Sequence, residues 1–222
     1  MLLNENKIPF NKISSCVFDT TSVNTGEVNG IVCKLETSFN HPILELACRH
    51  HMYELVCGAA SEIIIGKPQK GKGDRKTTAP YEPLFKKLCD SWGDIDKDNL
   101  TTFEEASLPH MLITHIEEAK RFLHKWLCNE NSMREDYLEM AKLCLIYIGC
   151  DLPDKMKKSK LRAPGAYHHA HLMSKVIYVL KLALLKPSFI NDIDRIRSLA
   201  LFYSVYYAKA WLTNKFAAEA PI

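Results

Sequence analysis

The chain has 222 residues, of which 47% are hydrophobic and 25% are charged, proportions typical of a globular protein with a core of ordinary size. The net charge of +3 and the pI near 8.3 allow a nucleic-acid partner but fall below the pI of about 9 that marks a strongly basic domain. The longest apolar runs are too short to cross a bilayer, and the first residues lack the pattern of a signal peptide. We therefore expect a soluble intracellular protein with no membrane partner, and the eight cysteines, none in CxxC spacing, to be reduced thiols.

The first third of the chain carries β-strand signals. Residues 13–18, 28–36 and 42–47 are rich in β-branched and apolar side chains, and Thr25-Gly26 gives a turn signal between the first two. A helix is predicted from near His50 to Gly66, with an apolar face formed by Met52, Leu55, Val56, Ala59, Ala60 and Ile63. These patterns predict a β-β-β-α segment over residues 1–66, in which the first two strands form a hairpin.

The remainder, residues 67–222, is predicted to be a separate helical domain. It begins with a basic loop rich in Gly and Pro, and helices are expected at 81–92, after Pro109, before Gly149, from Pro164 to Pro187, and at 192–216. Thr101 to Glu104 and Ser132 to Glu135 have the spacing of capping boxes. The predicted fold class is an α/β N-terminal part followed by a predominantly helical part, mainly α overall.

Asp19 ends the first predicted strand and opens the polar segment DTTSVNTG. A carboxylate at the carboxyl end of a core strand faces the crevice where α/β sheets bind ligands, and two-metal phosphoryl-transfer sites use such carboxylates for Mg²⁺ or Mn²⁺. An aspartate in a DTTS segment also bonds readily to nearby backbone amides and caps a turn. Spacing alone favours the turn.

Cys48 and His51 form a CxxH pair at the start of the predicted helix. A zinc site needs about four ligands, and His168, His169 and His171 are the other histidines that could supply them. The simpler interpretation is that Cys48 ends a strand and His51 packs near the helix N-terminus.

Two basic clusters suit contact with a phosphate backbone, although solvated linkers have the same composition. The weak candidates for nucleic-acid contact are Lys67, Lys70, Lys72, Arg75, Lys76, Lys157, Lys158, Lys160 and Arg162, with Lys155 beside the second group.

The segment FDTTSVNTGEVNG, followed 29 residues after Asp19 by CRHH and a helix, resembles the middle of hAT-superfamily transposases, especially divergent transposon-derived proteins of invertebrates. In that family the second catalytic aspartate ends a strand of an RNase H-like domain, a CxxH motif introduces a helix, and a large all-helical insertion follows. Asp19, Ser22 and Asn24 match the first motif with one extra residue before the Asn, and Cys48 and His51 match the second. The stretch PGAYHHAHLMSKVIYVLKL also resembles the helical insertion of these relatives.

The chain departs from the family at several positions. The first and third catalytic acids cannot be placed, Glu219 is a poor match for the third, and the family's Arg-Trp pair is absent near His171. The resemblance therefore implies an internal transposase fragment, without the zinc-finger and dimerisation segments, in which Asp19 is a vestigial metal-binding carboxylate. No cofactor is expected, and Mg²⁺ or Mn²⁺ would bind only where a longer form completes the site.

The expected function is that of a transposase-derived, catalytically inactive nuclear protein. Its expected partners are DNA, bound weakly and without sequence preference, and a further copy or a full-length transposase. One alternative is a helical protein–protein interaction module that uses the aromatic-rich segment FYSVYYAKAWL. A second is a metal-dependent nuclease or strand transferase that recruits other acids, such as Glu54, Glu62, Asp192 or Asp194.

Overall fold

The computed structural model describes residues 9, 12–66, 81–104, 110–129, 134–157, 161–165 and 171–213. The protein is mainly α-helical, as predicted, and its residues divide into two compact units. The first unit runs to Leu55 and the second runs from Val56 to Thr213, so the division lies inside helix α4 (Arg49–Ile65).

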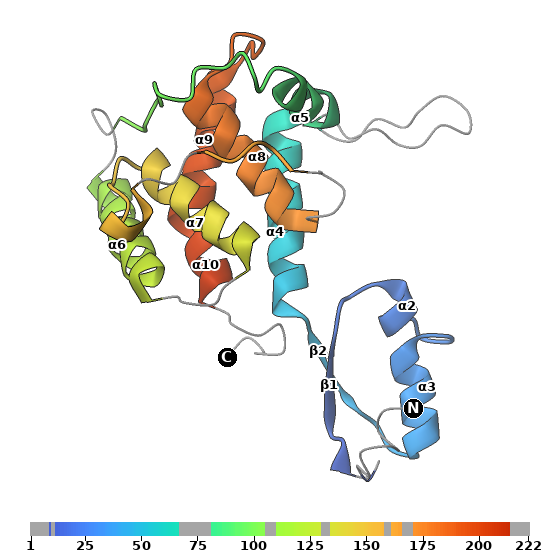
Figure 1. Ribbon diagram of the computed structural model, residues 1–222. Coiled ribbons are helices and arrows are strands. Elements are labelled where there is room, and N and C mark those ends of the chain that lie inside the picture. Colours follow the sequence, from blue (N-terminus) through green and yellow to red (C-terminus); the bar gives the residue numbers. More distant parts are fainter. Residues whose placement is uncertain are drawn as a thin grey trace, which may run out of the picture. The chain divides into compact units, whose positions relative to one another are not determined.

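The first unit is built around two short parallel strands. Strand β1 (Ser15–Phe18) pairs with β2 (Leu44–Ala47), and helices α2 (Ser22–Thr25) and α3 (Ile31–Phe39) make the connection between them. Figure 1 shows α3 running beside this strand pair. Parallel strands need a crossover connection, and a helix is the usual one. The first unit is therefore a β-α-β arrangement.

The predicted strand at residues 28–36, and with it the hairpin, is wrong because this stretch forms α3. Its apolar residues also fit a helical face, on which Val32 and Phe39 are buried. Gly30 precedes the helix where a Cβ would lie 2.4 Å from the carbonyl oxygen of Gly26, so a larger residue does not fit there. The left-handed residue Asn40, with φ of 57°, ends the helix.

The second unit is an array of helices. They are α5 (Tyr81–Asp90), α6 (His110–Asn129), α7 (Glu135–Tyr147), the 3-10 turn η2 (Asp154–Met156), α8 (His171–Leu185), α9 (Ile193–Phe202), the π-helical segment η3 (Tyr203–Tyr207) and α10 (Ala208–Leu212). Helix α8 packs against α7 and α9 (Figure 1), and its residues 176–185 are all buried. Among the described residues, no helix combines the length and apolar character needed to cross a membrane.

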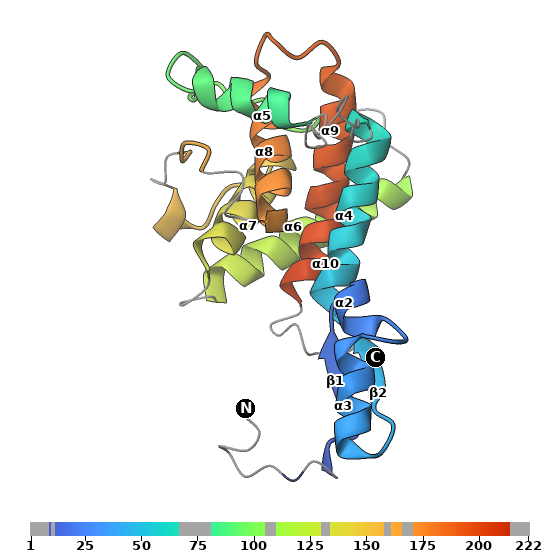
Figure 2. The same ribbon diagram turned by 90° about the vertical axis from the view of Figure 1, so that its right-hand side faces the viewer.

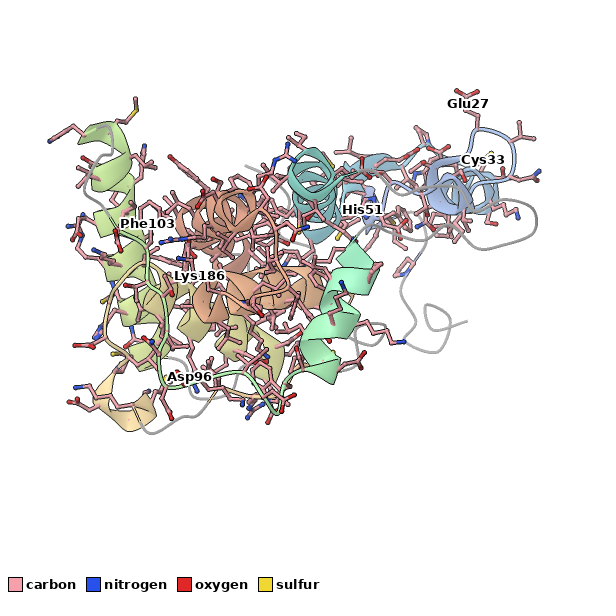
Figure 3. All side chains as sticks on the ribbon, turned by 90° about the horizontal axis from the view of Figure 1, so that it is seen from above. Glu27, Cys33, His51, Asp96, Phe103 and Lys186 are labelled. Atoms are coloured by element: carbon pink, nitrogen blue, oxygen red, sulfur yellow. The ribbon has the colours of Figure 1, made fainter. Side chains whose placement is uncertain are left out.

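The predicted helix start at Thr101 is wrong. The amides of Thr101 and Phe103 donate to the carbonyls of Leu184 and Tyr147, at 2.8 and 2.7 Å, so this segment is a strap across α7 and α8 and not a helix cap. Figure 3 labels Phe103 on the strap and Asp96 on the loop before it. Pro164 lies in an irregular segment, and the described part of α8 starts at His171. The proposed cap at Ser132 lies outside the described residues, and α7 begins at Glu135.

Helix α4 has the predicted position but buries a different face. Met52, Leu55, Val56 and Ile63 are 44%, 51%, 48% and 75% exposed, whereas the residues that α4 buries are Cys57 and Ser61. Those two side chains contact the hydroxyl of Tyr203, and Figure 2 shows α4 alongside α9 and α10. The apolar stripe predicted for the core is therefore on the surface.

The aromatic segment of the last helix is mostly internal. Tyr203, Tyr207 and Trp211 are buried, and the Tyr207 and Trp211 rings stack with centroids 5.9 Å apart. Tyr206 remains 44% exposed. The interaction face proposed for FYSVYYAKAWL is therefore largely part of the core.

Candidate functional site at the strand edge

The carboxyl ends of β1 and β2 bring Asp19 and the CxxH pair to one edge of the sheet. Phe18 is aligned with Ala47, and the amide of Cys48 donates to the carbonyl of Phe18 at 2.7 Å. Asp19 follows β1 directly, Cys48 follows β2, and His51 lies in the first turn of α4. Parallel strands end at the same edge, which is where α/β sheets place ligand-binding residues.

Asp19 is also a turn residue. Its Oδ1 accepts hydrogen bonds from the Thr21 amide at 3.1 Å, from Thr21 Oγ1 at 2.5 Å and from Asn24 Nδ2 at 2.5 Å. The bond to the amide two residues ahead is an Asx turn, and it holds the chain as it enters α2. Asp19 therefore lies at the end of a strand and also stabilises a turn.

These contacts favour the ionised carboxylate of Asp19. Its pKa is lowered chiefly by the hydrogen bond from the Thr21 hydroxyl, then by the Thr21 amide and Asn24, with a further contribution from His51. Hydrogen bonds donated to a carboxylate stabilise its charged form. The lowered pKa also distinguishes Asp19 from a carboxyl group crowded by other acids, whose pKa would be raised.

The second motif supplies a histidine but no complete metal site. His51 Nδ1 lies 3.6 Å from Glu54 Oε2, and Figure 3 labels His51 on α4. Within the described ranges, no three His, Cys, Asp or Glu side chains come together as metal ligands. The residues that the structure describes therefore fit neither a two-metal centre around Asp19 nor a zinc site at Cys48 and His51. The side chains of His168, His169 and His171 lie outside the described part.

Two of the other acids considered for a nuclease, Glu54 and Asp192, have local roles. Glu54 pairs with His51, and Asp192 caps α9 by accepting a hydrogen bond from the Arg195 amide at 3.4 Å. Asp192 is exposed at that helix end. Its capping bond explains its position without a metal.

Most of the predicted nucleic-acid contacts cannot be placed. Lys67, Lys70, Lys72, Arg75, Lys76, Lys158 and Lys160 lie outside the described residues. Lys157 pairs with Asp154 at 2.8 Å and Arg162 pairs with Glu135 at 2.7 Å, and each partner raises the pKa of its cation. Both cations are exposed and can contact an anion only in competition with these acids.

A buried ion pair in the second unit was not predicted from the sequence. Lys181 on α8 is 1% exposed, and its Nζ lies 2.7 Å from Glu139 Oε1 on α7 and 5.6 Å from the centre of the Trp92 ring. Burial lowers the pKa of Lys181, and Glu139 opposes that effect. The lysine within the apolar run 176–185 could have indicated this pair, because a lysine is rarely fully buried without a partner.

Comparisons of the chain with protein-family models, with curated proteins and with solved structures give no match.

Proposed function

We propose that this protein is a transposase-derived, DNA-binding protein of the hAT type that does not cleave DNA by itself. The observation that carries the proposal is the shared strand edge, where Asp19 ends β1 and the pair Cys48 and His51 leads into α4. The helical second unit follows directly. This is the order in which the resembled family arranges its aspartate, its CxxH motif and its helical insertion.

The absence of cleavage follows from the surroundings of Asp19. A two-metal centre needs several carboxylates that grip the attacking and leaving oxygens together. In the described residues Asp19 instead accepts hydrogen bonds from Thr21 and Asn24, and no second acid joins it in a metal-binding group. Residues of such a unit act together, so one carboxylate alone retains little of the activity.

The proposed activity is therefore charge-driven binding to DNA, in the nucleus, alone or together with a further copy or a full-length transposase. The second unit carries exposed cations on α6 and around η2 that suit a phosphate backbone. Binding of this kind positions a protein on DNA without reading sequence.

One electrophoretic experiment tests both parts of the proposal. Supercoiled plasmid is incubated with increasing protein at low salt, with Mg²⁺ or Mn²⁺, and with the Asp19→Ala variant in parallel. We expect both the wild type and the variant to retard the plasmid in the gel. After the protein is removed, the plasmid should still be supercoiled in both cases. Relaxed circles formed by the wild type and not by the variant would show an active nuclease, and unshifted plasmid at every protein concentration would contradict DNA binding.

The exposed stripe on α4 favours a second candidate, a protein–protein interaction module. Isolated exposed apolar residues are ordinary, but Met52, Leu55, Val56 and Ile63 follow one helical face. Sedimentation equilibrium of the wild type and of an Ile63→Asp variant separates the two candidates. Self-association that the variant abolishes, without any plasmid retardation, would favour the module.

A further inference from the structure

The C-terminal half of α6 and the nearby η2 turn form an exposed cationic surface. Its members are Arg121, His124, Lys125, Lys155 and Lys157, all of which are exposed. We call this set the α6 cationic surface.

The helix spacing places three members on one side of α6. Arg121, His124 and Lys125 are separated by three and four residues, and the opposite side of the helix, with Leu123, Trp126 and Leu127, is buried. The outward stripe is continued by Cys128, which is also exposed.

A hydrogen bond from Lys155 ties the η2 turn to this stripe, and an ion pair lies within the turn. Lys155 Nζ donates to the carbonyl of Cys128 at 2.9 Å, and Lys157 Nζ lies 2.8 Å from Asp154 Oδ1. The pKa of Asp154 is lowered chiefly by its hydrogen bond and charge interaction with Lys157, with a small further contribution from His124 on α6. The five members therefore belong to one continuous part of the surface of the second unit.

The charge of this surface is positive on balance. Arg121, Lys125, Lys155 and Lys157 are opposed there by Asp151 and Asp154, and Glu117, which pairs with the neighbouring Lys120 at 2.8 Å, also interacts with Arg121. The region contrasts with residues 90–98, where Asp90, Asp94, Asp96 and Asp98 outnumber the cations.

We propose that the α6 cationic surface contacts the phosphate backbone of double-stranded DNA. This inference rests on the proposed function and specifies which part of the second unit carries it. Arg121 and Lys125 are about 6 Å apart along the helix axis. Two cations at this spacing can contact phosphates of the same strand, which follow one another at about 3.4 Å of rise along the duplex.

The composition of the surface argues for DNA over a membrane or a protein partner. The large apolar side chains that are exposed in the described residues lie elsewhere, and on α6 only Met111 at the far end of the helix belongs to them. Interfaces between proteins usually centre on buried aromatic or aliphatic anchors, and amphipathic membrane helices insert apolar residues. A surface of exposed cations without such anchors fits a phosphate backbone.

The first test is a pair of matched double substitutions measured by fluorescence anisotropy with a labelled duplex. Arg121→Gln with Lys125→Gln should weaken binding on the order of tenfold at low salt and reduce the slope of log K against log salt by about 2. Lys86→Gln with Lys87→Gln, which removes two exposed cations from α5, should leave both quantities close to those of the wild type. All four side chains are exposed, and thermal unfolding followed by circular dichroism verifies that both variants fold.

The second test uses native cysteines and no substitution. Cys128 on the surface and Cys89 at the end of α5 are both free and exposed, so both should react with an alkylating reagent. Duplex DNA should slow alkylation of Cys128 and leave Cys89 unchanged when the products are followed by mass spectrometry.

The outcomes separate this inference from the proposed function. If both double variants bind the duplex as strongly as the wild type, and duplex DNA does not slow the alkylation of Cys128, the assignment of the surface is wrong. DNA binding by the protein would still stand. A wild-type protein that does not bind the duplex would overturn both.

Discussion

Glu139 on α7 and Lys181 on α8 form an ion pair of 2.7 Å in which the lysine is 1% exposed and the glutamate 21% exposed. The pair joins two helices at the centre of the second unit. Breaking a buried pair leaves an uncompensated charge, whereas replacing both partners with apolar residues is often neutral. Its contribution can therefore be measured by comparing one-sided and two-sided substitutions.

Glu139→Gln should lower the free energy of unfolding by roughly 3–5 kcal/mol, measured by urea denaturation, because Lys181 loses its counter-charge. The matched control on the same helix is Glu135→Gln, which breaks the exposed pair with Arg162 and should cost less than about 1 kcal/mol. The double variant Glu139→Leu with Lys181→Met should recover most of the loss. Equal effects of the two single substitutions would show that the Lys181 pair is not buried as described.

The buried phenol of Tyr147 should make the folded protein less stable at alkaline pH. Its hydroxyl donates to the carbonyl of Arg197 at 2.7 Å, and burial raises its pKa from 10.0 to about 12. A raised pKa means that the folded state keeps a proton that the unfolded state releases, so the contribution is full below pH 10 and is lost as the pH rises toward 12.

In urea denaturation, the stability of the wild type should therefore fall between pH 9 and pH 11 by about 1 kcal/mol more than that of Tyr147→Phe. The Phe variant should itself be less stable near neutral pH, because it leaves the Arg197 carbonyl without this donor. Parallel pH profiles for the two proteins would contradict the buried phenol.

Tyr203, the first residue of η3, links this segment to α4 through its hydroxyl. Ser61 Oγ lies 2.7 Å from this oxygen, and Cys57 Sγ lies 3.3 Å from it, inside the core. Tyr203→Phe should reduce the free energy of unfolding by about 1–3 kcal/mol, because buried polar partners lose their bond. Tyr206→Phe, one helical turn along and exposed, should change it by less than about 0.5 kcal/mol. Thermal or urea unfolding that ranks the two variants in the reverse order would refute this contact.

Asp19 should titrate below the usual pKa of an aspartate. NMR titration of its carboxyl carbon should show a lowered pKa in the wild type, and Thr21→Val should raise it because the largest stabilising hydrogen bond is lost. Ser22→Ala, on the same turn, should leave the pKa of Asp19 unchanged. A pKa of Asp19 above its ordinary value would indicate further carboxyl groups close by, and with them the beginning of a metal site.

The sequence predicted element types better than it predicted how they pair and which faces they bury. The apolar and β-branched residues of β1 and β2 identified both strands, but residues 28–36 have a composition that suits a strand and a helix equally. Only the packing of Val32 and Phe39 decides between them. The helix α4 was predicted at its correct place, but its apolar stripe was assigned to the core, whereas Cys57 and Ser61 make the buried contact.

The candidate site was predicted in the same partial way. The position of Asp19 at a strand end and its role in a turn were both visible in the sequence, because each depends on neighbouring residues. The meeting of Asp19 with Cys48 at one edge depends on the parallel pairing of β1 with β2, which no local pattern in the sequence reports. The pair of Glu139 and Lys181 joins residues far apart in the sequence, and no local pattern reports such a contact.

The most direct measurement of the central claim is the salt dependence of binding to a labelled DNA duplex. We expect the logarithm of the association constant to fall linearly with the logarithm of NaCl concentration, with at least a tenfold loss between about 50 and 200 mM. The affinity should be the same for unrelated duplex sequences, since backbone contacts carry no sequence information. A protein that fails to bind at about 50 mM NaCl, or whose affinity is insensitive to salt, would contradict the account.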